Sequence, residues 1–153
     1  MALSRFRLAV VMEKRLLSNR WQSEQWFPVE ARPDSGDLTA PRRLDTETER
    51  WIYPGFNLDF FSDEAEGYFL NLSAEHPFLF IMWRMENELA VPCVVTASYN
   101  EASRMLDAGE AVEGLPMPAE IRAVAEAFTL EHYKPERKQR ARAPSFAGAR
   151  RDP

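Results

Sequence analysis

The chain has 153 residues, of which 45% are hydrophobic and 12% aromatic, and its formal net charge is −5. This composition is typical of a globular protein and excludes a disordered chain, and the length fits one domain with its own core. The single cysteine, Cys93, excludes an internal disulfide. No stretch approaches the roughly 18 uncharged apolar residues of a membrane span, and the N-terminal sequence is unlike a secretory signal. We therefore expect a cytoplasmic protein without a membrane span.

The charge is distributed unevenly along the chain. Residues 134–153 contain seven Lys or Arg and two Asp or Glu, a net charge of +5, whereas residues 1–133 contain twelve and twenty-two, a net charge of −10. An acidic body argues against nucleic-acid binding by that body. We predict one globular domain over residues 1–133 and a basic, mobile tail over residues 134–153.

Six segments have the pattern of β-strands: residues 5–14, 21–31, 50–61, 67–73, 77–87 and 89–98. The first alternates apolar and polar side chains with a period of two. Residues 77–87 are apolar on both faces, which predicts a central strand, and Asn87 with Glu88 predicts a hairpin to residues 89–98.

The strand predicted over residues 21–31 contains Trp21 and Trp26, which are five positions apart and should therefore point to opposite faces. Pro28 predicts either an edge strand or a bulge. We assign Trp21 to the core. Trp26 falls among polar residues, so we expect it at the boundary of the apolar face, as a partner contact.

Two stretches depart from the regular strand pattern. Residues 32–49 lack periodicity and read as a long loop, of the kind that is usually functional or disordered. Pro54 and Gly55 either bend residues 50–61 or divide them into two short strands.

Two helices are predicted at the end of the domain. The first begins after Asn100 as N-cap and stops at Gly109. The second covers residues 118–133 and carries one apolar stripe, formed by Ile121, Val124, Ala125, Phe128 and His132. Strands followed by helices predict an α+β fold: a curled antiparallel sheet of about six strands, with the last of two C-terminal helices packed on it. A half-barrel with the last helix packed against it is equally consistent.

The sequence offers little for catalysis. We interpret His132 as a packed or capping residue and Cys93 as a small buried hydrophobe, because no basic residue lies near it in sequence. The acidic run in residues 59–66 lacks the spacing of a calcium loop. The motifs of zinc, nucleotide and serine-hydrolase sites are absent. We predict no catalytic residue, no metal and no cofactor, and therefore a protein that is not an enzyme.

Surfaces are more informative. A row of apolar side chains on residues 77–87 ends in a charged residue, which is typical of the rim of a binding site, although the same row is core if the sheet closes. The basic tail also carries a phenylalanine, which a pure spacer rarely contains. The predicted partner contacts are Trp26, Phe80, Met82, Arg84, Lys134, Arg137, Lys138, Arg140, Arg142 and Phe146.

Several segments resemble DUF3305, a bacterial domain of unknown function. They include "HPFLFIMWRMEN", "AVPCVVTASYNEASRMLDAGE" and "PMPAEIRAVAEAFTLEHYKPERKQRAR", and the resemblance covers nearly the whole chain. Members of this family are typically encoded beside formate dehydrogenase subunits, a chaperone that matures molybdenum enzymes and an iron–sulfur protein. The resemblance therefore implies an accessory role in the assembly or maturation of a molybdenum-dependent formate dehydrogenase, with one of its subunits or that chaperone as partner.

Two other functions stay open from the sequence. The first is a small-molecule-binding domain or enzyme with a pocket in the curled sheet, for which Arg84, Tyr99 and Glu101 are candidate lining residues. The second is a nucleic-acid or ribosome-associated factor that acts through its basic tail.

Overall fold

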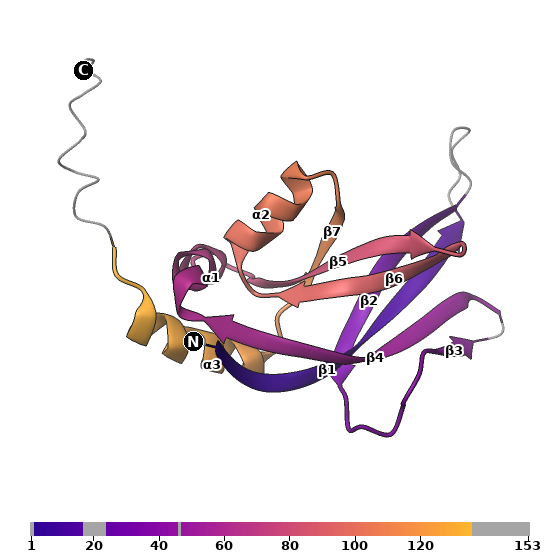
Figure 1. Ribbon diagram of the computed structural model, residues 1–153, viewed down its shortest axis with the longest axis horizontal. Coiled ribbons are helices and arrows are strands. Elements are labelled where there is room, and N and C mark those ends of the chain that lie inside the picture. The colour runs from indigo at the N-terminus through magenta and orange to yellow at the C-terminus, as the bar shows by residue number, and fades with distance from the viewer. Residues whose placement is uncertain (1, 17–23, 46, 136–153) are drawn as a thin grey trace, which may run out of the picture.

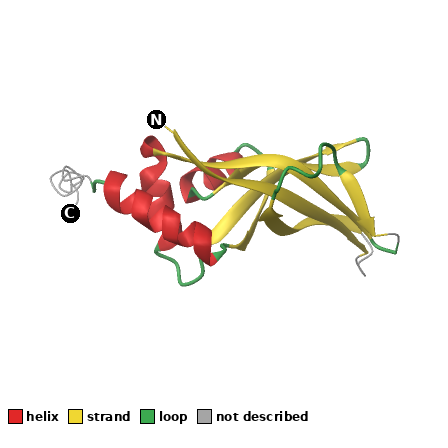
Figure 2. Cartoon of the chain, turned by 90° about the horizontal axis from the view of Figure 1, so that it is seen from below, coloured by secondary structure: helices red, strands yellow, loops and turns green. Residues whose placement is uncertain are grey.

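The computed structural model describes residues 2–16, 24–45 and 47–135 of the chain. Two antiparallel sheets face each other, and the helices gather at one end of the strands (Figure 1, Figure 2). One sheet has the order β2-β1-β4-β3 and comprises β1 (Ala2–Leu16), β2 (Glu24–Pro33), β3 (Arg42–Asp45) and β4 (Glu49–Phe61). The other has the order β6-β5-β7 and comprises β5 (Phe78–Glu86), β6 (Leu89–Thr96) and β7 (Ala111–Pro116).

The helical end is built from four short segments. They are the 3₁₀ turn η1 (Ser62–Glu64), α1 (Ala65–Leu72), α2 (Tyr99–Asp107) and α3 (Ala119–His132). Helix α1 follows β4 and α2 follows β6, whereas α3 comes last and packs chiefly against α1.

The main core lies between the two sheets and continues under α1 and α3. Its largest fully buried side chains come from β1, β4, α1 and β5, and they include Met12, Leu58, Phe60, Tyr68, Leu79 and Ile81. The buried stripe of α3, with Ile121, Ala125 and Phe128, completes this core. Burial of this apolar surface is the dominant favourable term in folding.

The α+β class is confirmed, but the single curled sheet of six strands is wrong. Residues 67–73, predicted as a strand, form most of α1 and its C-cap Ser73, because the buried residues Ala65, Tyr68 and Asn71 recur with helical spacing. Strands β3 and β7 were not predicted, since each is short and has no fully buried residue. Residues 50–61 form one strand, which is bent where Gly55 adopts a φ of +90°.

The position of Trp26 was also predicted wrongly, because it is only 7% exposed and belongs to the main core. Strand β2 is an edge strand, as Pro28 predicted, and its pairing with β1 shifts register at this point: Met12 pairs with Pro28, but Val11 pairs with Glu30. A bulge of one residue exchanges the faces of the strand. Trp26 therefore points inward, whereas Trp21 lies outside the described residues.

The segment predicted as a loop over residues 32–49 covers the outer face of the larger sheet. Leu38 and Leu44 pack on a small second core formed by Ala9, Val11 and Ile52. The Asp34 carboxylate holds the start of this segment, because it accepts hydrogen bonds from the main-chain N–H groups of Gly36 at 2.9 Å and Gly55 at 2.8 Å. These contacts hold the described part of this segment against the larger sheet.

The hairpin turn after β5 and the C-terminal end of α2 are as predicted, but the N-cap of α2 is not. Asn87 and Glu88 both adopt positive φ, as a two-residue hairpin requires. Gly109 ends α2 with a φ of +88°, as predicted. The N-cap of α2 is Ser98 and not Asn100, because the Ser98 hydroxyl accepts the hydrogen bond from the Glu101 N–H group at 3.0 Å.

Candidate functional site

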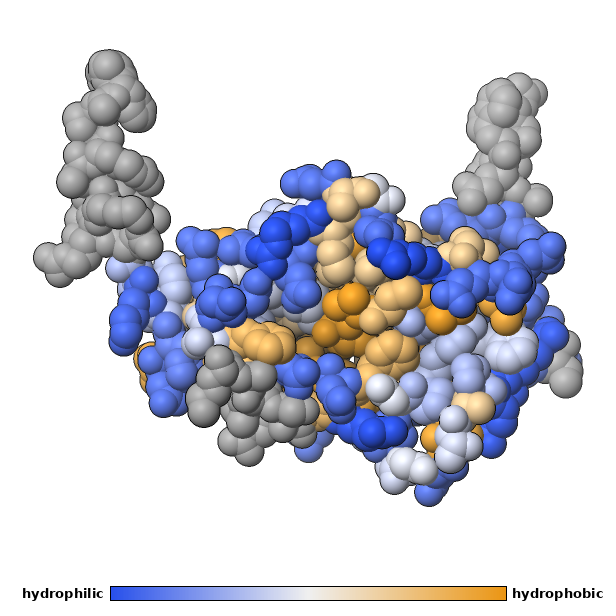
Figure 3. All heavy atoms as spheres, viewed as in Figure 1, coloured by the Kyte–Doolittle hydropathy of each residue, from blue (hydrophilic) through white to orange (hydrophobic). Residues whose placement is uncertain are grey.

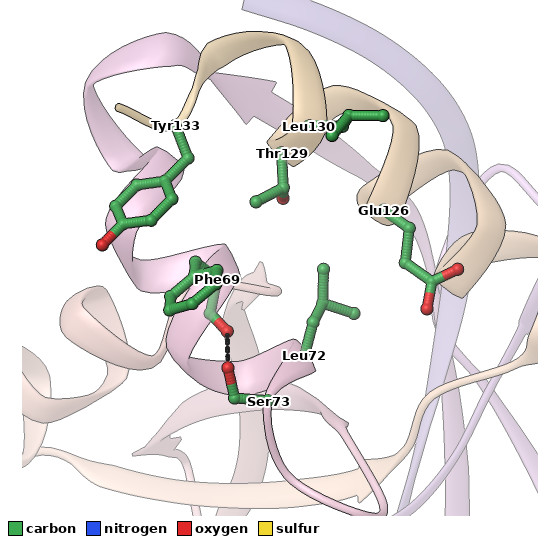
Figure 4. Close-up of a pocket in the computed structure, with 7 residues that line it drawn as sticks. All are labelled: Phe69, Leu72, Ser73, Glu126, Thr129, Leu130 and Tyr133. Carbon is green, nitrogen blue, oxygen red and sulfur yellow. Dashed lines mark hydrogen bonds between the residues drawn. The ribbon is translucent and has the colours of Figure 1, made fainter. Parts of the chain in front are cut away.

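A cavity of about 300 Å³ opens between α1 and α3 (Figure 4). We call it the α1–α3 groove, and it is lined by Phe69, Leu72, Ser73, Glu126, Thr129, Leu130 and Tyr133. The first three come from α1 and its C-terminal end, and the others come from α3 and the residue after it. Most of the accessible lining is apolar, so the groove is suited to an apolar side chain.

The walls of the groove expose large apolar side chains. Leu130 is 88% exposed and Phe69 is 41% exposed. Tyr133 stacks on Phe69 with ring centroids 4.4 Å apart and closes one end of the groove. The opposite side of α3 faces the core, where the ring centroids of Phe128 and Phe60 lie 5.6 Å apart. Helix α3 is therefore anchored on one side and open on the other.

The groove also contains a polar group that lacks a partner. Thr129 is only 7% exposed, and Figure 4 shows its side chain pointing from α3 into the space between Phe69 and Leu72. Its Oγ1 atom makes no hydrogen bond within the described part of the chain. A buried hydroxyl without a partner has lost its hydration and costs free energy. A ligand in the groove could supply the missing hydrogen bond.

An acidic hollow adjoins the α1–α3 groove at Tyr133. It has a volume of about 470 Å³ and is lined by Ser62, Asp63, Ala65, Glu66, His132, Tyr133 and Lys134. Both carboxylates lie at the start of the helical segment, where the helix dipole stabilises negative charge. The groove and the hollow together place an apolar site beside two carboxylates, which share the hollow with the Lys134 ammonium.

The other side of α1 is closed by polar contacts. The buried Asn71 amide donates hydrogen bonds to the carbonyls of Phe78 at 2.8 Å and Ala97 at 2.9 Å, and it accepts one from the Phe78 N–H group at 3.0 Å. Gly67 faces Ser98 so closely that an added Cβ would lie 2.0 Å from the Ser98 Oγ atom. These contacts fix α1 against β5 and against the link between β6 and α2, which sets one wall of the groove.

Tyr68 anchors α1 to the main core. Its hydroxyl accepts a hydrogen bond from the Phe61 N–H group at 2.9 Å, and its ring packs against Phe60 and Phe128. Burial raises the pKa of Tyr68 to about 12. The phenol is therefore a neutral structural group at ordinary pH.

The titratable residues considered from sequence do not converge on a catalytic arrangement. The His132 ring packs on Phe128 with centroids 4.2 Å apart. Cys93 is exposed, contrary to prediction, because it is the extra residue of a bulge: Met82 pairs with Val94 and Trp83 with Pro92. Among the described residues, no group of three or more His, Cys, Asp or Glu side chains could hold a metal ion.

The predicted partner contacts do not form one surface in the described chain. Trp26 and Met82 are buried, Phe80 is partly buried, and the exposed Arg84 is paired with Glu110. Lys134 is exposed and lines the acidic hollow. The other predicted contacts, Arg137, Lys138, Arg140, Arg142 and Phe146, lie outside the described residues and stay predictions.

The residues proposed to line a small-molecule pocket are also dispersed. Arg84 is engaged by Glu110, and Tyr99 is 51% exposed. Glu101 lines a hollow of about 460 Å³ between β4 and β6, together with Cys93 and Thr96. Figure 3 shows a face that is mostly hydrophilic, with hydrophobic side chains gathered near its centre. Arg84 and Tyr99 are not among the residues that line the hollow at Glu101, so the three candidates do not share one pocket.

The sequence does not predict the groove residues, because residues 67–73 have the pattern of a strand. One available signal was the spacing of Ala65, Tyr68 and Leu72, which fits a helix, after the acidic residues that favour a helix start. A second was Leu130, an apolar residue off the predicted stripe of α3. Together they would have indicated two helices with apolar residues left uncovered.

Comparison with known proteins identifies a family but no characterised relative. No curated protein and no solved structure gives a significant match. No helix in the described part of the chain is long and apolar enough to cross a membrane. The family described as "Protein of unknown function (DUF3305)" matches residues 7–142, which is most of the chain. The protein therefore belongs to the DUF3305 family.

Proposed function

We propose that this protein is a non-enzymatic accessory protein that binds a partner polypeptide in the α1–α3 groove. The observation that carries the proposal is the groove itself, an apolar cavity of about 300 Å³ beside a leucine that is 88% exposed. An exposed apolar site of this kind fits an anchor side chain of a partner. The unpartnered Thr129 hydroxyl offers a hydrogen bond to a polar group of the same partner.

The carboxylates at the acidic hollow indicate which charge the bound segment should carry. Asp63 and Glu66 lie beside the groove, and the exposed Glu131 follows Leu130 on α3. Electrostatic complementarity favours a segment with Lys or Arg near its apolar anchor and disfavours an acidic one. We therefore describe the occupant as an apolar anchor flanked by basic residues.

The identity of the partner is proposed from the family resemblance. It is a subunit of a molybdenum-dependent formate dehydrogenase or the chaperone that matures this enzyme. Binding in the α1–α3 groove would hold the partner during assembly or maturation, without chemistry on the part of this chain.

The test measures binding of the purified formate dehydrogenase subunits and of the purified chaperone to immobilised full-length protein. Leu130→Asp places a charge in the apolar wall and should reduce binding at least about tenfold, which is the loss of one interface anchor. Leu106→Asp on α2, where the leucine is 55% exposed, is the matched control and should bind like the natural protein. Equal binding by the Leu130→Asp variant would exclude the groove, and no binding by the natural protein would exclude these partners.

A further inference from the structure

The α1–α3 groove ends where the C-terminal segment of the chain begins. Tyr133 lines both the groove and the acidic hollow, and Lys134 lines the hollow as well. Residues 136–153 follow directly and lie outside the described residues. Any contact of this segment with the groove would thus start at the rim of the groove.

The composition of the segment matches the occupant that the groove favours. Residues 134–153 contain seven Lys or Arg and two Asp or Glu, and their one aromatic residue is Phe146. Arg140 and Arg142 precede this phenylalanine, and Arg150 and Arg151 follow it. An apolar anchor between basic residues is therefore already present in the same chain, opposite an apolar groove with an acidic neighbour.

The segment is long enough to return over α3. Phe146 lies twelve positions after Lys134, and this stretch spans up to about 40 Å when extended. The groove runs along α3 only from Glu126 to Tyr133, about 10 Å of helix. A tether of this length gives an effective concentration on the order of millimolar, so even weak docking would fill the groove.

We propose that residues 134–153 occupy the α1–α3 groove of their own chain in the absence of a partner, with Phe146 as the apolar anchor. The basic residues before Phe146 lie against the acidic hollow. A partner then has to displace the segment, which lowers its apparent affinity by the fraction of chains in which the groove is free. This competitive role rests on the proposed function, whereas the docking itself does not.

The test uses the full-length protein without any partner. Cys93→Ser removes the natural thiol, and Ser145→Cys then takes a nitroxide spin label next to Phe146. We expect the label to cause loss of the NMR methyl signals of Leu72, Thr129 and Leu130, while the methyl signals of Leu106 on α2 persist. Adding Phe146→Ala should restore the groove signals, and high salt should restore them in part.

Each other outcome contradicts the inference. Groove signals that persist in the labelled protein would show that the segment is not docked there. Signal loss that survives Phe146→Ala would exclude Phe146 as the anchor. Loss that grows with protein concentration would indicate docking on a second copy of the chain. Because no partner is present, these results are independent of whether formate dehydrogenase binds the protein.

Discussion

The two sides of helix α1 differ in how completely they are packed and hydrogen-bonded. On the side toward α2 and β5, Asn71 makes three hydrogen bonds and Gly67 leaves no space for a methyl group before Ser98. On the side toward α3, Phe69 is 41% exposed, a cavity of about 300 Å³ remains open, and the Thr129 hydroxyl is unpartnered. The same helix is therefore locked on one side and incomplete on the other.

This difference separates stability from binding. Native proteins pair almost all buried polar groups, so an unpaired one needs an explanation, and a ligand is one such explanation. If the closed side serves stability, substitutions there should lower the free energy of unfolding. If the open side serves binding, substitutions there should leave that free energy almost unchanged.

The largest effect is expected for Asn71→Ala on the closed side. The substitution leaves the carbonyls of Phe78 and Ala97 and the Phe78 N–H group without their partner. Unmet buried hydrogen bonds cost about 1–3 kcal/mol each, so we expect the free energy of unfolding to fall by about 4 kcal/mol in denaturant titrations. Asn100→Ala, which removes one exposed hydrogen bond to Glu66, should cost less than about 1 kcal/mol. Equal losses in both variants would contradict the closed-side assignment.

A smaller effect is expected from pH, through Tyr68 in the core beneath α1. Its pKa is about 12 in the folded protein and about 10 in the unfolded chain, because burial disfavours the phenolate. A pKa raised by folding contributes stability that is complete below pH 10 and is lost as the pH rises toward 12. We expect the contribution of Tyr68 to the free energy of unfolding to fall by about 2 kcal/mol between pH 9 and pH 12.

The comparison that isolates Tyr68 is with Tyr68→Phe. This variant loses the hydrogen bond from the Phe61 N–H group at every pH below 10, so it starts from a lower stability. Its free energy of unfolding should then fall less steeply above pH 10 than that of the natural protein. Parallel curves in denaturant titrations from pH 9 to pH 12 would mean that the phenol is not buried.

The same contrast explains which parts of the fold could be predicted from the sequence. The strand at residues 5–14 and the apolar stripe of α3 were found because the large apolar side chains of each recur with a regular period, whether or not the opposite face is also buried. Helix α1 was not, because Phe69 and Leu70 are apolar yet exposed, which hides the helical spacing of its buried residues. An apolar residue left uncovered for binding misleads any argument that assigns apolar residues to the core.

The candidate site was less predictable than the fold for a second reason. A bulge exchanges the two faces of a strand without a reliable sequence signal. One bulge in β2 and another in β6 place Trp26 and Cys93 on the side opposite to the predicted one. Pro28 predicted the bulge in β2 as one of two alternatives but not its consequence for Trp26. The groove depends on two helices that are distant in sequence, so no local pattern contains it.

The smallest effect on stability is expected for Thr129→Val on the open side. The substitution keeps the shape of the side chain and removes a buried hydroxyl that has no hydrogen-bond partner within the described chain. The free energy of unfolding should stay the same or rise by up to about 1 kcal/mol. Binding of the partner polypeptide should weaken, because the hydroxyl is then missing from the groove.

Thr96→Val is the matched control, since Thr96 is also buried but its hydroxyl accepts a hydrogen bond from the Ser98 N–H group at 3.0 Å. The same chemical change should cost about 1–2 kcal/mol there, because it leaves that N–H group unpaired. The two valine variants therefore compare a buried threonine whose hydroxyl has a hydrogen-bond partner with one whose hydroxyl has none in the described chain. A loss of more than about 1 kcal/mol in Thr129→Val would mean that its hydroxyl is already satisfied in the free protein, as it would be by a segment docked in the groove. Stability measured in the Phe146→Ala background then decides between that segment and any other partner of the hydroxyl.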